Sequence, residues 1–226
     1  MSGRSTSGWT TLALIAAVLT APLTVFVGVF GQRFGWWGLD VALDLLTLTV
    51  APWLLGAGAI ASLFLLCRAR RGGIVDWLLA LFAVGIVATG VMLYADHISG
   101  QDPDQLPPLD ASTSPAEPPT FSASLARLHQ ASPDATCSGV VAISTQVRAE
   151  EATDALKRAG FTPLPSSLFR VEGTHTGLWF LMKHDATIRI RPGQTDVRVA
   201  ARSNRPDGGE TCRLLARIVE ELQPRS

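Results

Sequence analysis

The sequence predicts a three-helix transmembrane region followed by an α+β domain, in which an antiparallel sheet has helices packed on one face. Three long apolar runs, each with at most one charged residue, fill most of the first 95 positions, and most charged residues come after them. Within residues 169–202, short runs alternate apolar and polar side chains, which is typical of strands with one buried face. A hydrophobic content of 47% and a mean hydropathy of +0.27 agree with a chain that joins these two kinds of structure.

Charge and proline content divide the chain into three regions: a three-span transmembrane region at 1–95, a Pro-rich acidic linker at 96–119 and an exported α+β domain at 120–226. The linker holds six of the 14 prolines and five acidic residues, with no Lys or Arg. Such a composition does not form a packed core and is typical of an extended tether. Its second half has the form of an arm that can lie against the following domain.

The first apolar run, Trp9 to Gly31, has 23 residues and no charge. At about 1.5 Å per residue it is long enough to cross a hydrocarbon layer of about 30 Å. A cleaved signal peptide is the alternative, but its apolar core is typically about 7 to 15 residues long, and two more apolar runs follow here. These runs predict helices from about Val41 to Cys67 and from Trp77 to Ala95.

A basic turn between the second and third runs determines the predicted orientation. It contains Arg68, Arg70 and Arg71, whereas no other segment between spans has more than one Lys or Arg. Basic residues next to membrane helices are retained on the cytoplasmic side. We therefore expect a cytoplasmic N-terminus, an outer loop around Trp36, and export of everything after Ala95.

Two acidic residues, Asp40 and Asp44, lie one helical turn apart at the start of the second span. A carboxylate there meets the positive end of the helix dipole and stays near water, which favours two interfacial capping acids. An ion or proton site is the alternative, because an acid inside a membrane is costly unless it has a function.

Local patterns predict the elements of the exported domain. Apolar residues at a period of 3.6 indicate helices, strict alternation indicates strands, and a β-branched run between turn residues indicates a further strand. The predicted elements, in order, are a short helix at 121–131, a strand from Gly139 to Ser144, a helix from Arg148 to Ala159, strands from Phe169 to His175, Asp185 to Arg191 and Asp196 to Arg202, and a last helix that follows a capping sequence at Asp207 and ends near Leu222. We expect the helices to cover one face of the sheet and to leave the other face open.

Four arginines form the sharpest functional feature of the sequence. Alternation predicts that they project from neighbouring strands on one face, where guanidinium groups can bind a carboxylate or phosphate through two hydrogen bonds. These residues are Arg189, Arg191, Arg198 and Arg202, and the candidate ligand-binding set adds Arg205, Asp185 and His184. The alternative is a self-neutralised face, on which acidic residues of the same strands pair with the arginines.

Other chemistry finds less support. His175, His184 and Asp185 include suitable metal ligands, but they lack the spacing of a metal motif, so no metal or cofactor is predicted. The sequence has no Gly-x-Ser-x-Gly nucleophile motif, and no catalytic residue is identified. From residue 120 onward the chain has 14 bases against 11 acids, an excess too small to predict nucleic acid as a partner.

The cysteines predict a disulfide in the exported domain. Cys137 and Cys212 both lie in the exported region, where thiols oxidise, and we expect them to be bonded. Two buried free thiols are the alternative, since cysteine also packs well as a small apolar residue. Cys67, at the cytoplasmic end of the second span, is expected to stay reduced.

Three short motifs resemble the signature of domain-of-unknown-function family 1499. They are the run from His184 to Arg191 (HDATIRIR), Asp196-Val197-Arg198 and Arg202-Ser203-Asn204-Arg205, with a similar Pro-Pro-x-Phe sequence ending at Phe121. The likeness covers about residues 106–223 and implies the α+β fold. It also implies a bacterial membrane protein, because a few spans precede the domain in many bacterial members. His184 and Asn204 depart from the family's pattern, and no catalytic activity is established for the family.

These observations predict a membrane-anchored envelope protein, non-enzymatic, whose extracytoplasmic α+β domain binds an anionic ligand or protein partner. The alternative is an envelope enzyme that acts on a phosphate- or carboxylate-bearing substrate through the Arg-rich sheet face. A small membrane-subunit role in a transport or assembly complex is a third hypothesis. The expected location is the bacterial inner membrane, multi-pass, with the C-terminal domain in the periplasm. The expected partners are the lipid bilayer and an anionic small molecule or envelope protein, without nucleic acid.

Overall fold

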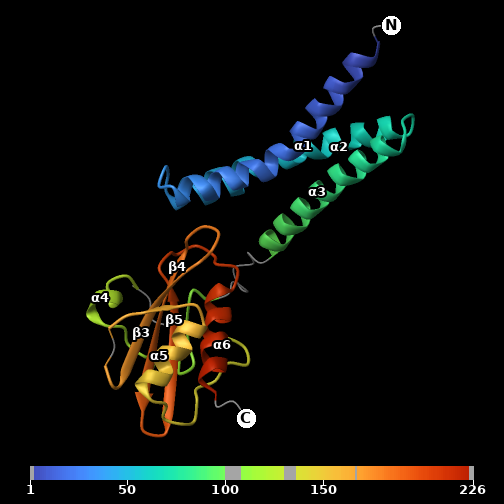
Figure 1. Cartoon of the computed structure of the whole chain (residues 1–226). Helices are drawn as coiled ribbons and strands as arrows, with labels where there is room; N and C mark the ends of the chain where they lie inside the picture. Colours follow the sequence, from blue (N-terminus) through green and yellow to red (C-terminus); the bar gives the residue numbers. More distant parts are fainter. Residues whose placement is uncertain (1–2, 100–107, 130–135, 166, 224–226) are drawn as a thin grey trace. The chain divides into compact units, whose positions relative to one another are not determined.

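A computed structural model of the chain (Figure 1) describes residues 3–99, 108–129, 136–165 and 167–223. The chain divides into two compact units, Met1–Ser99 and Gly100–Ser226. Each unit has its own buried apolar cluster and is described by itself.

The first unit consists of helices only. Its elements are α1 (Gly3–Arg33), a π-helix η1 (Asp40–Val50) that continues directly into α2 (Ala51–Ala69), and α3 (Ile74–Ser99). Among the described residues, three helical stretches are long and apolar enough to cross a membrane, with mean hydropathies of 2.4, 2.0 and 2.3; they are Gly8–Arg33, Asp40–Ala69 and Ile74–Ala95. The prediction of three apolar helices is confirmed.

Small residues on α2 allow its close packing against α1. A side chain added at Gly58 would have its Cβ 3.4 Å from Cα of Val18, so the two backbones approach closely at this point. Ala61 and Leu65, farther along the same face of α2, are also buried in the cluster that contains Val18. The helices α2 and α3 pack against each other in turn.

Polar side chains bond to carbonyl oxygens of the π-helix η1. The hydroxyls of Thr47 and Thr49 donate to carbonyl oxygens five residues earlier, at 2.8 and 2.7 Å, which matches the wider turn of a π-helix. From α3, the hydroxyl of Tyr94 donates to the carbonyl of Thr47. Asp40 lies in the first turn of this helix, at the N-terminal position predicted for a capping acid.

The second unit is built on a five-stranded antiparallel sheet with the order β1-β5-β4-β3-β2. Its strands are β1 (Asp110–Ser112), β2 (Thr162–Pro163), β3 (Arg170–Thr176), β4 (Lys183–Arg191) and β5 (Gln194–Ala201). Its helices are α4 (Ala123–Ala126), α5 (Ala149–Arg158) and α6 (Glu210–Leu222). This arrangement confirms the predicted α+β class.

The core of the second unit lies between the sheet and two helices. Figure 1 shows α5 and α6 lying on the same side of the long strands β3, β4 and β5. Ile188 of β4 and Val197 of β5 point to this side and are fully buried. They belong to one apolar cluster with Leu156 of α5 and Leu215 of α6. The alternation that predicted the strands thus produces this buried face.

A glycine in β3 allows the close packing of α5. A side chain at Gly173 would have its Cβ 3.3 Å from a methyl carbon of Leu156 and 3.2 Å from Cβ of Phe161. A glycine in a strand often marks such a close approach. The backbone of β3 and the apolar stripe of α5 therefore meet without a side chain between them.

Three local predictions are wrong in their extent. Residues Gly139 to Ser144 do not form a strand, and only Ile143 joins the sheet, by a bridge to Thr195. The helix predicted at 121–131 covers only Ala123–Ala126 of the described residues, and 130–131 lie outside them. The segment predicted as linker at 96–119 is not all linker, because α3 continues to Ser99 and Asp110–Ser112 forms β1.

The capping sequence before the last helix also differs from the prediction. Gly209, in a left-handed conformation with φ 81°, precedes the helix, and Asp207 acts from two residues farther upstream. The carboxylate of Asp207 accepts hydrogen bonds from the backbone N–H of Thr211 at 2.7 Å and of Gly209 at 2.8 Å. Asp207 thus caps the helix, but Glu210 forms an ion pair with Arg213 instead of completing a capping box.

Candidate functional site

The four predicted arginines lie on the sheet face opposite α5 and α6, here called the Arg face. The antiparallel register places Thr187 beside Arg198 and Arg189 beside Asp196. Arg191, two residues after Arg189, shares this face, and Arg202 extends it beyond the end of β5 through a backbone hydrogen bond with Lys183. The polar residues of the alternating pattern therefore gather on one side of the sheet.

The Arg face is not open, contrary to the expectation from sequence. It is partly covered by the segment 108–129, here called the arm. Asp110 of β1 pairs with Ala200 of β5, and the N–H of Thr113 donates to the carbonyl of Val197 at 2.9 Å. Farther along the arm, Phe121 and Leu125 are buried in a small cluster with Ala200. The arm thus belongs to the folded domain, as its predicted form allowed.

Arg198 attaches the arm to the middle of the Arg face. Its Nε and Nη2 donate to the two carboxylate oxygens of Asp110, at 2.9 and 2.6 Å, and its Nη1 donates to the carbonyl of Pro119 at 3.2 Å. The guanidinium carbon lies 4.9 Å from the centre of the Phe121 ring, within range of a cation–π contact. Only 9% of the Arg198 side chain is exposed. These contacts make Arg198 a structural residue.

Asp185 and Arg202 form a second buried group on the same face. Arg202 donates to both oxygens of Asp185, at 2.7 and 2.8 Å, and the Thr174 hydroxyl donates to one of them at 2.6 Å. Nε2 of His129 lies 2.8 Å from the other oxygen, and its ring stacks on Phe121 with centroids 4.6 Å apart. The carboxylate is fully buried, so each of its bonds is protected from water.

The environment of Asp185 keeps it ionised. Burial alone would raise the pKa of this carboxyl, but the hydrogen bonds from His129, Arg202 and Thr174 and the charge of Arg202 outweigh it and hold the pKa well below its usual range. The group therefore acts as a permanent acceptor that joins β3, β4, the chain after β5, and the arm.

The remaining two arginines form a more accessible corner, here called the Arg189–Arg191 corner, with Asp196 and Glu117. Arg189 and Arg191 both pair with the buried carboxylate of Asp196, at 2.9 and 2.8 Å. Their second carboxylate is Glu117 of the arm, which lies 2.8 Å from Nη1 of Arg191 and 3.5 Å from Nη1 of Arg189. Glu117 is 68% exposed, whereas the two arginines are 22% and 33% exposed. One side of the corner is thus fixed and the other faces solvent.

Two exposed apolar residues lie at the same end of the sheet as this corner. Leu168 and Phe169 are 73% and 64% exposed, and the carbonyl of Phe169 accepts from the N–H of Ile190, between the two arginines in sequence. The next residue, Arg170, pairs with Arg189 in the sheet register. Positive charge and apolar surface therefore occur side by side at this end of the sheet.

Two members of the predicted ligand-binding set lie outside all three groups of the Arg face. His184 faces the helices and is buried, and its Nε2 lies 3.1 Å from the carboxylate of Asp207. Burial would raise the pKa of Asp207, but the hydrogen bonds from His184, Thr211 and Gly209 lower it. Arg205 lies in the loop between β5 and α6. The structure therefore does not bring the seven predicted residues into one site.

The structure also shows the state of the cysteines and the arrangement of the candidate metal ligands. Cys137 and Cys212 form a disulfide in the structure, with Cα atoms 5.5 Å apart, which is the pairing that the sequence predicts. It joins the segment before Ile143 to α6. Cys67 is free and exposed in the first unit. Among the residues that the structure describes, no group of three or more His, Cys, Asp or Glu side chains is arranged to hold a metal ion.

Sequence reasoning missed the arm residues that complete each cluster: Asp110, Glu117, Phe121 and His129. One signal was available, since the acidic composition of 96–119 complements the basic residues that follow. The pairing of β1 with β5 determines which acid of the arm meets which arginine. This pairing could not be predicted, because a strand of three residues is too short to show an alternating pattern.

Comparison with known proteins identifies a family for the second unit. Residues 110–222 match the family model described as protein of unknown function (DUF1499). The match begins at the first residue of β1 and ends at the last residue of α6, so it includes the arm from Asp110 onward. Neither the search of curated proteins nor the search of solved structures found a match.

Proposed function

This chain belongs to the DUF1499 family of proteins of unknown function, and we propose that it is a membrane-anchored protein whose second unit binds an acidic partner without catalysing a reaction. The proposed location is the inner membrane of a bacterium, with three spans, a cytoplasmic N-terminus and a periplasmic second unit. The three apolar helices and the arginines of the turn at 68–71 support the anchor and its orientation.

The Arg189–Arg191 corner is the proposed binding site, and the exposure of Glu117 is the observation that carries the proposal. Exposed ion pairs contribute only about 0 to 1 kcal/mol, because water and salt screen them. A carboxylate from a partner can therefore replace Glu117 at little cost, while the buried carboxylate of Asp196 keeps the two guanidinium groups in position. The site is neutral while the Glu117 carboxylate is paired and becomes cationic when that side chain leaves the arginines.

The apolar neighbours of the corner favour a protein segment over a small anion. An acidic peptide can place a carboxylate between the arginines and an apolar side chain on Leu168 or Phe169, which are exposed at the same end of the sheet. A phosphate ion would use only the charged half of this surface. The proposed partner is therefore an acidic segment of another envelope protein.

The enzymatic alternative has less support. The titratable pair that a hydrolase could use, His129 and Asp185, is buried, with side chains 3% and 0% exposed, and Asp185 is held by Arg202 as well. Within the corner, the carboxylates of Asp196 and Glu117 are both engaged in ion pairs with arginine. A general acid or nucleophile is therefore not supplied by the corner, whose groups are suited to binding.

The test compares three variants of the full-length protein in a neutral detergent. The probe is a fluorescent peptide of alternating Glu and Leu, with inorganic phosphate as competitor. Because Glu117 competes with the probe, Glu117→Gln should raise peptide affinity about fivefold, and Arg191→Gln should lower it about fivefold. Binding should weaken as salt rises, since charges are screened beyond about 8 Å at physiological ionic strength.

The matched control is Arg213→Gln, which removes an exposed arginine that is paired with Glu210 on another surface. It should leave the affinity unchanged. Equal loss in the Arg191→Gln and Arg213→Gln proteins would show that only net charge matters, and an unchanged affinity in Glu117→Gln would show that this side chain does not compete. Either result would refute the corner as the binding site.

A further inference from the structure

A cavity in the first unit combines cationic and apolar walls. It has a volume of about 720 Å³ and lies between the first half of α1 and the C-terminal end of α2. It is lined by Thr10, Ala13, Leu14, Phe64, Cys67, Arg68 and Arg71. We propose that this cavity binds one anionic phospholipid, with the phosphate at the arginines and an acyl chain along the apolar wall.

The order of the lining residues along the two helices matches the order of groups in a phospholipid. On α2, Phe64 lies four residues before Arg68, and on α1, Leu14 lies four residues after Thr10. Four residues of helix correspond to about 6 Å along the axis. Because α1 and α2 run in opposite directions here, the polar residues lie near the ends of the apolar stretches Gly8–Arg33 and Asp40–Ala69, and the apolar residues lie about one turn deeper in the span. A phospholipid has the same order, with a charged headgroup at the surface and apolar acyl chains below it.

Tryptophans place the mouth of the cavity at headgroup depth. Trp9, next to Thr10 on α1, is 75% exposed, and Trp77, in the first turns of α3, is 40% exposed. Trp side chains prefer the interface between hydrocarbon and headgroups. The arginines of the cavity are thus at the level where lipid phosphates occur, in whichever leaflet this end of the bundle lies. Lipid binding at this cavity therefore does not depend on the proposed orientation of the chain.

The charge at this end of the bundle favours an anionic ligand. Arg68 has an acidic neighbour, Asp76, at 4.0 Å, whereas Arg71 forms no ion pair with any residue that the structure describes. Arg70, between them in sequence, is exposed and does not line the cavity. Three arginines next to one aspartate leave a net positive charge beside an apolar wall, which is the combination that binds anionic headgroups.

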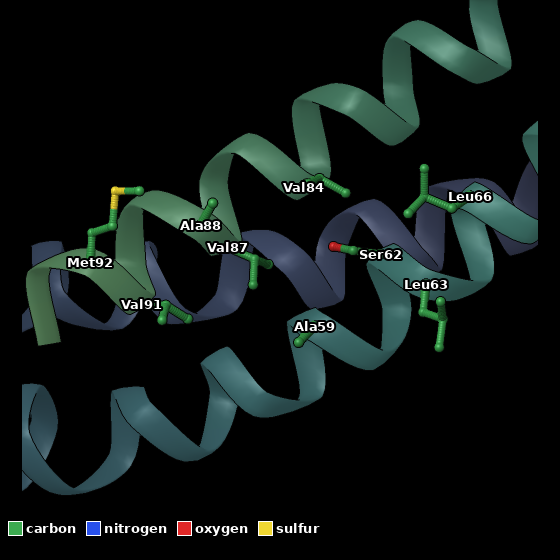
Figure 2. A pocket seen from close by; sticks show the side chains of 9 residues that line it. All are labelled: Ala59, Ser62, Leu63, Leu66, Val84, Val87, Ala88, Val91 and Met92. Atoms are coloured by element: carbon green, nitrogen blue, oxygen red, sulfur yellow. The ribbon is translucent and has the colours of Figure 1, made fainter. Parts of the chain in front are cut away.

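A second groove in the same unit lacks the arginines that line the cavity. Figure 2 shows a groove between α2 and α3, whose lining side chains are apolar except for Ser62. The hydroxyl of Ser62 donates to the carbonyl of Gly58 at 2.9 Å, within its own helix, so it is already used. This groove can accept acyl chains but has no cation for a phosphate. Selectivity for anionic lipid should therefore come from the cavity beside Arg71.

The experiment measures lipid binding to the full-length protein in neutral detergent by native mass spectrometry. Phosphatidylglycerol and phosphatidylcholine with the same acyl chains are titrated, and glycerol phosphate tests the headgroup without chains. We expect one phosphatidylglycerol to bind at least about fivefold more tightly than phosphatidylcholine, and glycerol phosphate not to compete. Equal binding of the two lipids would overturn the proposal, and so would effective competition by glycerol phosphate, since it would identify a simple anion site.

Three variants locate the site. Arg71→Gln should weaken phosphatidylglycerol binding about fivefold and leave phosphatidylcholine unchanged, whereas Arg70→Gln, which removes the same charge from a position outside the cavity, should change neither. Ala13→Phe, which fills the apolar wall, should weaken phosphatidylglycerol binding even though both arginines remain. Equal losses in the Arg70 and Arg71 variants would mean that the lipid is held by surface charge alone and would reject the cavity.

Discussion

Arg202 and Asp185 are joined by two hydrogen bonds, from Nε at 2.7 Å and from Nη2 at 2.8 Å, although 17 residues separate them in sequence. The pair connects the start of β4 with the chain after β5. His129 of the arm and Thr174 of β3 add their own bonds to the same carboxylate. Asp185, which the sequence placed in the candidate ligand-binding set, is therefore the acceptor that holds four segments together.

Replacing Asp185 with Asn should destabilise the second unit by about 3 kcal/mol, because the change leaves Arg202 and His129 beside a buried amide that cannot satisfy them. The free energy of unfolding is measured by urea unfolding of the full-length protein, followed by hydrogen exchange of peptides from β3 to β5. Thr153→Ala, at a partly exposed hydroxyl that bonds only within α5, is the control and should cost less than about 1 kcal/mol.

The same variant should change the response to acid. The folded pKa of Asp185 is lowered relative to the unfolded value of about 3.9, so its stabilising contribution is present above that pH and is lost as the pH falls toward the folded pKa. The free energy of unfolding of the Asp185→Asn protein should therefore fall less steeply between about pH 4 and pH 2 than that of the natural protein. Parallel slopes would show that the carboxyl titrates normally in the folded state.

The long strands could be predicted because one residue in two faces the core. From Asp185 to Arg191 this alternation is strict, and the structure extends the strand only to Lys183. The strand predicted from Gly139 to Ser144 does not form, and the cause lies outside its own sequence. To join the sheet, this run would have to pair with the edge of β5, where Asp110–Ser112 and Thr113 are already bonded. Only Ile143 pairs with β5, at Thr195.

The composition of the Arg face could also be predicted, but its accessibility could not. Alternation places Arg189, Arg191 and Arg198 on one face whichever segment covers it. Whether each arginine is structural depends on the depth of its carboxylate partner. Asp110 is 12% exposed beside Arg198, whereas Glu117 is 68% exposed beside Arg191. Both acids come from the arm, whose register on β5 was not encoded in any local pattern.

The disulfide should contribute about 3 to 5 kcal/mol to the stability of the second unit. Cys137 and Cys212 are 75 residues apart, and closing so long a loop restricts the unfolded chain strongly. Cys137→Ser should therefore lower the urea midpoint of the second unit, and a reductant should lower the midpoint of the natural protein by a similar amount. Cys67→Ser, at the free cysteine of the first unit, is the control and should have no effect.

Alkylation gives an independent check of the same bond. When the chain is unfolded without a reductant, a thiol reagent should label Cys67 and neither of the other two cysteines. Labelling of Cys137 and Cys212 under these conditions would contradict the disulfide.

The proposed orientation makes a direct prediction for fusion proteins in a bacterium. An alkaline phosphatase domain, which is active only after export, should be active when it is fused after Ser226 and inactive when it is inserted at Gly72. The physical reason is the retention of Arg68, Arg70 and Arg71 on the cytoplasmic side. Activity at Gly72 and silence after Ser226 would reverse the topology and would place the disulfide in a reducing compartment.

The last prediction concerns the attachment of the arm. Arg198→Lys keeps the charge but loses the two parallel bonds to Asp110, because an ammonium group cannot match the fork of a guanidinium. It also weakens the contacts with the Pro119 carbonyl and the Phe121 ring. The expected cost is about 2 to 3 kcal/mol, with faster hydrogen exchange in residues 110–121 than in α5.

The control for this change is Arg213→Lys, at an arginine whose side chain is 59% exposed, and it should be nearly neutral. If Arg198 were a ligand-binding residue with no structural part, Arg198→Lys would leave exchange in the arm unchanged while altering peptide binding. The structural role predicts a different order of events. The arm loosens first, Glu117 is withdrawn from Arg191 with it, and affinity for the acidic peptide rises as stability falls. Measuring exchange and affinity on the same preparation separates the two outcomes.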